Sequence, residues 1–428
     1  MKSIRKEDPR AWLYAPAHIV YNTGRRMRPR DTGGADANES FAATGGCGMK
    51  ARREKRRSAR RWVLGTLLGA LVPLCLVAAL VIVVDPFQHY RAASFYIPLV
   101  DRQIQNYINL GIARNYPYDT LSLGSSMTEN TRTEDIESAF GGTAVQLPFR
   151  GGNLVQFRMA MEVAFRKHAL RRVILCLDDY AFADNPHLPT TDMPMYLYDE
   201  NPLNDVYYWF NADVLQRIAD VYEYNRYALD KPDTLNLNEL YNWGDNMMYG
   251  RALTFANFTH YQVPEMPQYA ADALQEAIDE NLRLNLLALI QAHPETEFVF
   301  YFPPYSTLHW YHARLYGHVE RHLYARAVYA RALLAQPNVR LFDFQTNEDW
   351  IDEYEYFTDF THYGGEVNTA LTQAMGEGAF EVHDAQDVLA NNEIIRDFAF
   401  AFVPPDAQEL ALMREEAQAQ MRERLLLQ

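Results

Sequence analysis

Cysteine is nearly absent from this 428-residue chain, and basic residues are scarce in most of it. Only Cys47, Cys75 and Cys176 occur, and Cys176 alone follows the first 84 residues. No disulfide can therefore form within that larger part, and we expect Cys176, which lies in an apolar run, to be a buried strand residue. Residues 62–428 hold 24 Lys and Arg against 49 Asp and Glu. This acidic balance argues against nucleic-acid binding, which needs cations to neutralise phosphates.

The basic residues that the chain does have are concentrated at its start. Residues 1–61 carry 16 Lys and Arg against 6 Asp and Glu. Within them, residues 1–48 show no apolar period and include "DTGGADANESFAATGGCG", which predicts disorder. Met49 opens a segment typical of the start of a small membrane-anchored protein. We therefore interpret residues 1–48 as a dispensable extension or as a stretch that precedes the true start.

A run of 23 uncharged residues follows, "WVLGTLLGALVPLCLVAALVIVV", residues 62–84. It is long enough to cross a hydrocarbon core of about 30 Å at 1.5 Å per residue. A buried core helix would need a polar face, which this run lacks, and a cleaved signal peptide would have a shorter apolar region that ends in a small-residue cleavage site. We predict an uncleaved single-pass transmembrane helix in the cell membrane. The positive-inside rule then places residues 1–61 in the cytoplasm and residues 85–428 outside it.

The region 85–403 alternates between two kinds of pattern. Five short, continuous apolar runs predict buried parallel strands, at residues 120–124, 144–147, 172–177, 298–302 and 339–344. Helical periods separate or follow them, at about 129–139, 153–168, 270–292, 311–335 and 366–375. Continuous apolar strands that alternate with helices indicate a doubly wound α/β sheet covered on both faces, with ligands at the carboxyl ends of the strands.

Two segments depart from this alternation. Residues 183–269 form an insertion rich in Tyr, Asn, Asp and Trp, which we expect to be an ordered cap over the strand ends. Its aromatic side chains could stack on sugar rings, although aromatic residues more often pack a core. Residues 404–428 predict a C-terminal amphipathic helix with i,i+4 charge pairs, whose expected role is packing or self-association.

The stretch "DTLSLGSSMTEN", residues 119–130, places two small hydroxyls where a predicted strand gives way to a helix. A serine at this position gains backbone N–H groups and the positive end of a helix near its oxygen. An ordinary N-cap explains the same pattern. A nucleophilic role for Ser126 therefore requires a base and a group that orients the base.

Both further groups occur together near the end of the region. The segment "YFTDFTHYGGEVNTAL" carries Asp359 and His362 in a loop after the fifth predicted strand, at the sheet edge where Ser126 should also lie. Three residues of loop let the carboxylate fold back on the imidazole Nδ1–H, which leaves the other nitrogen free to take a serine proton. Ser126, Asp359 and His362 are therefore the candidate catalytic residues.

These motifs resemble those of the SGNH/GDSL hydrolase-like superfamily, and more narrowly its membrane-anchored bacterial cell-envelope branch, which is related to polysaccharide O-acetyltransferase-type proteins. The similarity spans about residues 85–375 and rests on "VDPF", "LGSSMTEN", "LCLDDYAF", "ENPL", "FYFPPY" and "DFTH". It implies a flavodoxin-like three-layer fold and acyl-ester chemistry, either hydrolysis or transfer to a hydroxyl. It also implies that Ser126 is the nucleophile, His362 the general base and Asp359 the residue that orients it.

Two of the family's blocks differ in this chain. The first commonly has Gly-Asp-Ser where this sequence has Gly124-Ser125-Ser126, and the third commonly supplies an Asn that donates to the oxyanion. The matching strand end here carries two aspartates, which cannot donate unless protonated. We expect one of them to point at the mouth of the site. The candidate oxyanion or substrate-binding residues, besides the Ser126 N–H, are Gly151, Gly152, Asn153, Asp178, Asp179 and Tyr305.

The leading hypothesis is a membrane-anchored, extracytoplasmic acyl esterase or O-acyltransferase that acts on an envelope or exported polysaccharide through a Ser126 acyl-enzyme. The resemblance adds a membrane-bound O-acyltransferase as an expected partner. The alternative is a catalytically degenerate scaffold of an envelope polysaccharide assembly, which the missing third-block Asn favours. No cofactor or metal is expected. The four histidines of one segment lack an H-E-x-x-H pattern and are assigned to a surface helix: His309, His312, His318 and His322.

Overall fold

The computed structural model describes residues 45–228, 234–256, 258 and 271–427, and the chain divides into two compact units, Met1–Gly69 and Ala70–Gln428. Helix α1 spans Gly45–Val84. Its part Lys55–Val84 is long and apolar enough to cross a membrane, by length and composition, as the uncharged run predicted. The disorder predicted for residues 1–48 falls mostly outside the described residues, and it is wrong for residues 45–48, which are helical.

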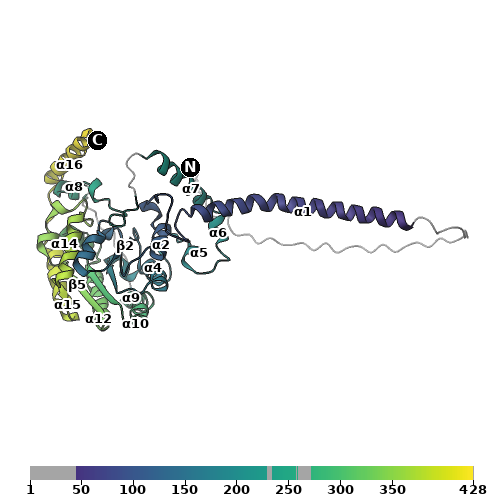
Figure 1. The fold of residues 1–428 in the computed structure, drawn as a ribbon. Coiled ribbons are helices and arrows are strands. Elements are labelled where there is room, and N and C mark those ends of the chain that lie inside the picture. Colours follow the sequence, from purple (N-terminus) through teal and green to yellow (C-terminus); the bar gives the residue numbers. More distant parts are fainter. Residues whose placement is uncertain (1–44, 229–233, 257, 259–270, 428) are drawn as a thin grey trace, which may run out of the picture. The chain divides into compact units, whose positions relative to one another are not determined.

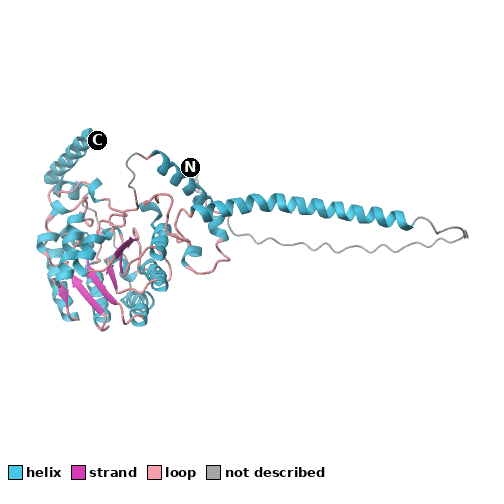
Figure 2. Cartoon of the chain, in the orientation of Figure 1, coloured by secondary structure: helices cyan, strands magenta, loops and turns pink. Residues whose placement is uncertain are grey.

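The larger unit is a mixed α/β structure around one six-stranded sheet (Figures 1 and 2). The strands run in the spatial order β2-β1-β3-β4-β5-β6. The first five are parallel, and β6 pairs antiparallel with β5. Their bounds are β1 Thr120–Gly124, β2 Ala144–Pro148, β3 Arg172–Cys176, β4 Glu297–Phe302, β5 Val339–Asp343 and β6 Glu381–Val382. All five predicted strands are therefore confirmed, and the short β6 was missed.

Helices connect the strands and cover the sheet. Outside the insertion they are α2 Gln105–Asn115, α3 Thr133–Phe140, α4 Leu154–Lys167, α9 Ala271–Asn281, α10 Ala288–Ala292, α11 Thr307–Leu315, α12 Val319–Leu334, α13 Glu348–Ile351, α14 Gly365–Glu377, α15 Ala385–Ala401 and α16 Ala407–Leu427. Short helical turns are η1 Arg102–Ile104, η2 Ser126–Thr128, η3 Asp179–Ala183, the π-helical η5 Leu282–Leu287 and η6 Tyr354–Tyr356.

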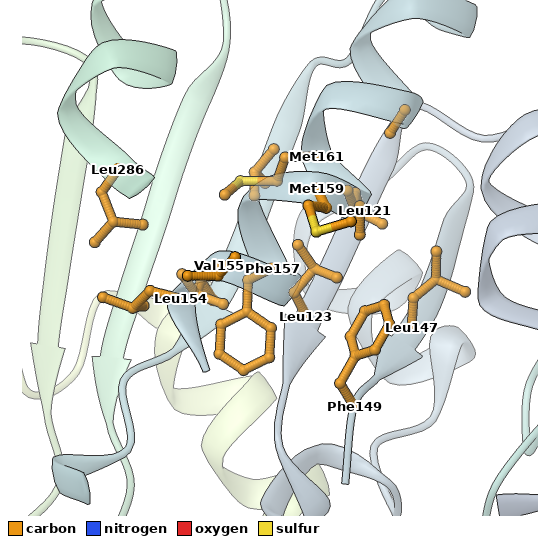
Figure 3. Packing of buried hydrophobic residues seen from close by; sticks show 14 of the residues in the cluster. Leu121, Leu123, Leu147, Phe149, Leu154, Val155, Phe157, Met159, Met161 and Leu286 are labelled. Atoms are coloured by element: carbon orange, nitrogen blue, oxygen red, sulfur yellow. The ribbon is translucent and has the colours of Figure 1, made fainter. Parts of the chain in front are cut away.

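The sheet is buried on both faces, which explains why its strands are continuously apolar. Successive strand residues point to opposite faces, and in β3 the side chains of Val173 and Leu175 join one hydrophobic cluster while Ile174 and Cys176 join another. Helices α2, α4 and α12 contribute to the first cluster, and α3 and α14 contribute to the second. Figure 3 shows α4 packing against β1 and β2 in the first cluster. Cys176 is buried and free, as expected.

The predicted helix 311–335 is two helices. Gly317 adopts φ +66° between α11 and α12, a left-handed conformation that ends a helix readily only at glycine. The predicted helix 270–292 is continuous but contains the π-helical turn η5. Helix α15 was missed. Helix α16, predicted from residue 404 onward, buries Leu410 and Ala417 and packs against helix α8, Arg251–Ala256, of the insertion.

All the regular elements in the described part of the insertion are helical, and loops connect them. It contains α5 Met195–Tyr198, α6 Val206–Trp209, α7 Ala212–Tyr227, η4 Gly244–Asn246 and α8 Arg251–Ala256. Residues 229–233, 257 and 259–269 of the predicted insertion lie outside the described residues. The side chain of Asn130, at the end of the serine motif, accepts the backbone N–H groups of Trp243 at 3.0 Å and Gly244 at 2.9 Å. The insertion is thereby attached beside the carboxyl end of β1.

Candidate active site

Two small residues shape the turn that presents Ser126. Strand β1 ends at Gly124, where an added Cβ would lie 2.4 Å from Thr128 Cγ2 and 2.9 Å from Cys176 Cβ. Ser125 is the N-cap of η2, and its hydroxyl accepts the Met127 N–H at 3.2 Å. The capping role therefore belongs to Ser125, and the next residue, Ser126, is left to open η2 with its own hydroxyl free for another partner.

That partner is His362, from the loop before α14. Ser126 Oγ lies 2.8 Å from His362 Nε2, and His362 Nδ1 lies 2.8 Å from Asp359 Oδ2. The other carboxylate oxygen of Asp359 accepts the backbone N–H groups of Thr361 at 2.8 Å and His362 at 2.7 Å. The carboxylate is thus fixed by its own loop, and with the proton on Nδ1 the imidazole offers Nε2 to the serine. Hydroxyl, imidazole and carboxylate have the geometry expected from the sequence order.

The charges of this group support each other. Burial by itself would lower the pKa of His362, but the hydrogen bond and negative charge of Asp359 outweigh it, so that the pKa is raised above the ordinary 6.5. Burial would likewise raise the pKa of Asp359, yet its bonds to His362 and to the loop N–H groups hold that pKa below the ordinary 3.8. An imidazolium that forms when His362 accepts a proton is therefore stabilised in place.

Ser126, Asp359 and His362 line one pocket of about 650 Å³. Its other walls are mainly polar side chains, with Trp243 and Met247, and come from η1 and the start of α2, the loop after β2, the insertion and the loop before α14. The remaining lining residues are Arg102, Gln103, Gln105, Asn106, Arg150, Gly151, Thr191, Trp243, Met247 and Thr358. Trp243 and Met247 belong to the insertion, so this part of it reaches the strand ends as predicted.

Trp243 and Glu129 are site features that the sequence interpretation missed. The ring of Trp243 meets that of His362 edge-on, with centroids 5.9 Å apart, and Arg102 lies over the Trp243 ring at 5.7 Å. Arg102 also pairs with the buried Glu129, which accepts from Gln105 Nε2 at 2.7 Å. The sequence feature that could have indicated both residues is the end of the serine motif, where the polar residues Glu129 and Asn130 directly follow a buried turn. Asn130 binds the backbone N–H of Trp243.

Of the three oxyanion residues predicted in the loop after β2, one lines the pocket and two use their donors elsewhere. Gly151 lines the pocket, as expected. The Gly152 N–H instead donates to the Phe149 carbonyl at 2.7 Å, and the Asn153 side-chain amide donates to the Leu188 carbonyl at 2.9 Å. Neither donor is therefore available to a group bound at Ser126. The motif "FRGGN" predicted the right loop, but a tight turn uses the Gly152 N–H and the Leu188 carbonyl of the insertion accepts from Asn153.

Asp178 and Tyr305 lie beneath the pocket and do not line it. Asp178 is 1% exposed and accepts from the Tyr305 hydroxyl at 2.7 Å. Burial raises its pKa to about 6, although Tyr305 and Ser125 hydrogen bonds oppose the rise. The expectation that a third-strand aspartate points at the mouth of the site is therefore wrong for Asp178, because the carboxylate turns inward to the tyrosine hydroxyl.

Asp179 turns away from the serine altogether. Its Oδ2 lies 2.9 Å from His309 Nε2 and 2.5 Å from His322 Nδ1. Burial would raise the pKa of Asp179, but the charges and hydrogen bonds of His322 and His309 hold it well below the ordinary value. The assignment of these histidines to a surface helix is also wrong, since both side chains are largely buried, with 13% and 9% exposed.

Comparisons with known proteins do not assign a function to this chain, so the assignment rests on the geometry of the site. No family model matches the chain, and no curated protein matches it. Among solved structures, it is similar to a protein from Streptococcus pneumonia that is described provisionally as a platelet activating factor. The two chains are 12% identical with a TM-score of 0.34, and the match covers 65% of this chain and 92% of the other. A similarity of this size carries no argument about function.

Proposed function

We propose that this protein is a membrane-anchored serine esterase or O-acyltransferase of the SGNH/GDSL hydrolase-like type. The single observation that carries the proposal is the unbroken line from Ser126 Oγ through the His362 ring to Asp359, with 2.8 Å at each step, in the wall of a pocket. Strand order β2-β1-β3-β4-β5 supports a flavodoxin-like fold, because that order places a ligand site at the carboxyl ends of β1 and its neighbours.

In the proposed reaction, Ser126 Oγ attacks the carbonyl carbon of an acyl ester while His362 Nε2 takes the serine proton. The imidazolium, held by Asp359, then gives that proton to the departing alkoxide, which leaves an ester on Ser126. Water or an acceptor hydroxyl loses a proton to His362 and attacks this ester, and the proton returns to Ser126 as the acyl group departs. The backbone N–H groups of Ser126 and Gly151 are the proposed oxyanion donors.

The pocket favours a polyhydroxylated acyl carrier. The amide of Gln103 and the hydroxyl of Thr191 offer hydrogen-bonding groups to sugar hydroxyls, and Trp243 offers a ring face or edge. The amides of Gln105 and Asn106 also line the pocket, but they are held in place by hydrogen bonds within the protein. Arg150 brings positive charge to the pocket of a domain that is acidic as a whole, whereas the charge of Arg102 is paired with Glu129. We propose an acylated polysaccharide of the cell envelope or an exported polysaccharide as substrate, with the chain attached to the cell membrane by α1 and its larger unit outside. A membrane-bound O-acyltransferase is the proposed source of the acyl group.

A fluorophosphonate probe tests the nucleophile directly, because it reacts with activated serines and needs no knowledge of the substrate. We expect labelling of the full chain in detergent at Ser126 and at no other serine, as mapped by peptide mass spectrometry. His362→Ala should abolish the label, since the serine then has no base. Label that persists at Ser126 in His362→Ala, or an unlabelled wild-type chain with native circular dichroism, would contradict the proposal.

The alternative is a scaffold of an envelope polysaccharide assembly that keeps the fold without catalysis. The alternative is favoured because the Gly152 N–H donates within a tight turn and the Asn153 amide donates to Leu188 of the insertion, and the loss of one oxyanion donor typically lowers turnover by about 10²–10³. Complementation in the cell separates the two functions. A scaffold would tolerate Ser126→Ala without loss of envelope acylation, whereas an enzyme would not.

A further inference from the structure

A second group of titratable side chains lies outside the catalytic pocket. Asp179 follows β3, His309 lies in the first turn of α11, and His322 lies in the first turn and a half of α12. One ligand atom from each residue lies within 4.8 Å of the other two. None of the three lines the pocket of Ser126. The proposed reaction uses none of them, so the group requires its own explanation.

The two imidazoles converge on one point. His309 Nε2 and His322 Nδ1 both face the same oxygen, Asp179 Oδ2, at 2.9 and 2.5 Å. A hydrogen-bonded histidine-aspartate pair needs only one imidazole on a carboxylate oxygen, as His362 and Asp359 illustrate. Two ring nitrogens and a carboxylate oxygen that all lie within 4.8 Å of one another, in a site where the aspartate is 7% exposed, have the composition and the spacing of a metal-ligand set.

From this geometry we propose that Asp179, His309 and His322 bind one divalent transition-metal ion, with Zn²⁺ as the preferred ion. Zn²⁺ takes histidine nitrogen and carboxylate oxygen at about 2.0–2.2 Å, usually in a tetrahedron. At those bond lengths tetrahedral ligand atoms lie roughly 3.3 Å apart. The two nitrogen-to-oxygen separations in the structure differ from that value by less than 1 Å, and the two nitrogens lie within 4.8 Å of each other, so small rotations of the three side chains are enough to admit the ion. A hard ion such as Mg²⁺ is disfavoured, because it prefers oxygen ligands.

The ion would connect Asp179, which follows β3, to the first turns of α11 and α12. Helix α11 lies beside the catalytic loop, which carries Asp359 and His362. The ring of Tyr305 stacks on that of His309 with centroids 4.2 Å apart, and the same tyrosine holds Asp178. Phe360, between Asp359 and His362 in sequence, stacks on His309 at 6.2 Å and on His312 at 4.6 Å. A metal at this point would therefore be a structural site that supports the floor and the back of the catalytic loop, not a participant in the acyl transfer.

The test is metal binding by the full chain in detergent, purified through a tag without histidine and stripped of metal by a chelator. Calorimetric titration with Zn²⁺ should give one tight site per chain. Co²⁺ should give a visible d–d absorption spectrum typical of a tetrahedral nitrogen and oxygen site. Bound Zn²⁺ should also raise the melting temperature, because an ion that binds only the folded chain stabilises it. A wild-type chain that binds neither ion at this stoichiometry would overturn the proposal and leave a hydrogen-bonded network.

Variants then locate the site. Asp179→Asn, His309→Gln and His322→Gln should each weaken Zn²⁺ binding tenfold or more and remove the cobalt spectrum. The control variant His187→Gln, which alters an exposed histidine paired with Glu280, should bind Zn²⁺ as the wild type does. His362→Ala separates the two clusters. If His362→Ala loses the ion while Asp179→Asn keeps it, Zn²⁺ binds at the catalytic residues and the proposal is wrong. If any variant of the three misfolds, the remaining two and the wild-type titration decide the question.

Discussion

Two clusters of histidine and aspartate lie near the carboxyl edge of the same parallel sheet, and they differ in how the groups are connected. In one, His362 stands between a hydroxyl and a carboxylate, with one partner on each ring nitrogen. In the other, His309 and His322 share a single carboxylate oxygen of Asp179. A linear arrangement moves a proton from one end to the other, whereas a convergent one encloses a point where a cation can be held.

The two clusters also differ in the solvent exposure of their side chains. The side chains of Asp359 and His362 are 42% and 31% exposed and line a pocket, as a site that receives a substrate requires. Those of Asp179 and His322 are 7% and 9% exposed. The same residue types therefore acquire different chemistry from connectivity and solvent access, and either property can be altered separately by mutation.

Breaking the linear arrangement should produce the largest effect. We expect Ser126→Ala and His362→Ala each to lower kcat/KM for hydrolysis of 4-nitrophenyl acetate by about 10³-fold or more. The double variant should lose little beyond either single one, because the two groups act as a unit. The assay follows released nitrophenolate, with circular dichroism as the control for folding. Losses that multiply in the double variant would show that the serine and the imidazole act independently.

A smaller loss is expected when only the orienting carboxylate is changed. Asp359→Asn should retain more activity than Ser126→Ala, because the nucleophile and the base both remain. The pH profile should move as well. Neutral His362 is the active base, so activity rises with pH through its pKa, which Asp359 raises. Without that carboxylate the midpoint of log kcat/KM against pH should fall. A midpoint that rises would contradict the assigned hydrogen bond.

The smallest shift should come from Asp178, which lies beneath the pocket and acts on His362 only through charge. Its negative form raises the pKa of His362 less than Asp359 does, and its own pKa is raised to about 6, so the effect applies mainly above that pH. Asp178→Asn should therefore lower the midpoint of the profile in the same direction as Asp359→Asn, but by less. The rate of fluorophosphonate labelling against pH measures it. An equal or opposite shift would place Asp178 in direct contact with the reacting groups.

Local pattern was sufficient for the parts of the molecule whose burial is set by neighbours in sequence. Continuous apolar runs such as 172–177 predicted strands covered on both faces, and the uncharged run 62–84 predicted a helix able to cross a membrane. The positions of Ser126, Asp359 and His362 also followed, because a parallel sheet brings the loops after its strands to one edge. Each of these inferences needs only periodicity and the direction of the strands.

The sequence pattern gave wrong predictions where one donor or one side chain had two possible partners. Gly152 and Asn153 have the residue types of oxyanion donors, but a local turn and a contact with Leu188 occupy them. Asp178 and Asp179 are adjacent, and the chain's direction at the end of β3 sends one to Tyr305 and the other to His309 and His322. No property of the two aspartates themselves distinguishes these outcomes.

What the sequence by itself determined is therefore the framework: an apolar helix at the start, a parallel sheet, and a serine, an aspartate and a histidine in an order that can meet at its edge. Only the tertiary structure decided which polar groups converge. Trp243 reaches the site through Asn130, 113 residues away, and His322 meets Asp179 across 143 residues. Periodicity reports which face of a segment is buried, whereas convergence depends on how loops close between distant segments, as at Gly317, where the chain turns and brings His309 and His322 to one carboxylate.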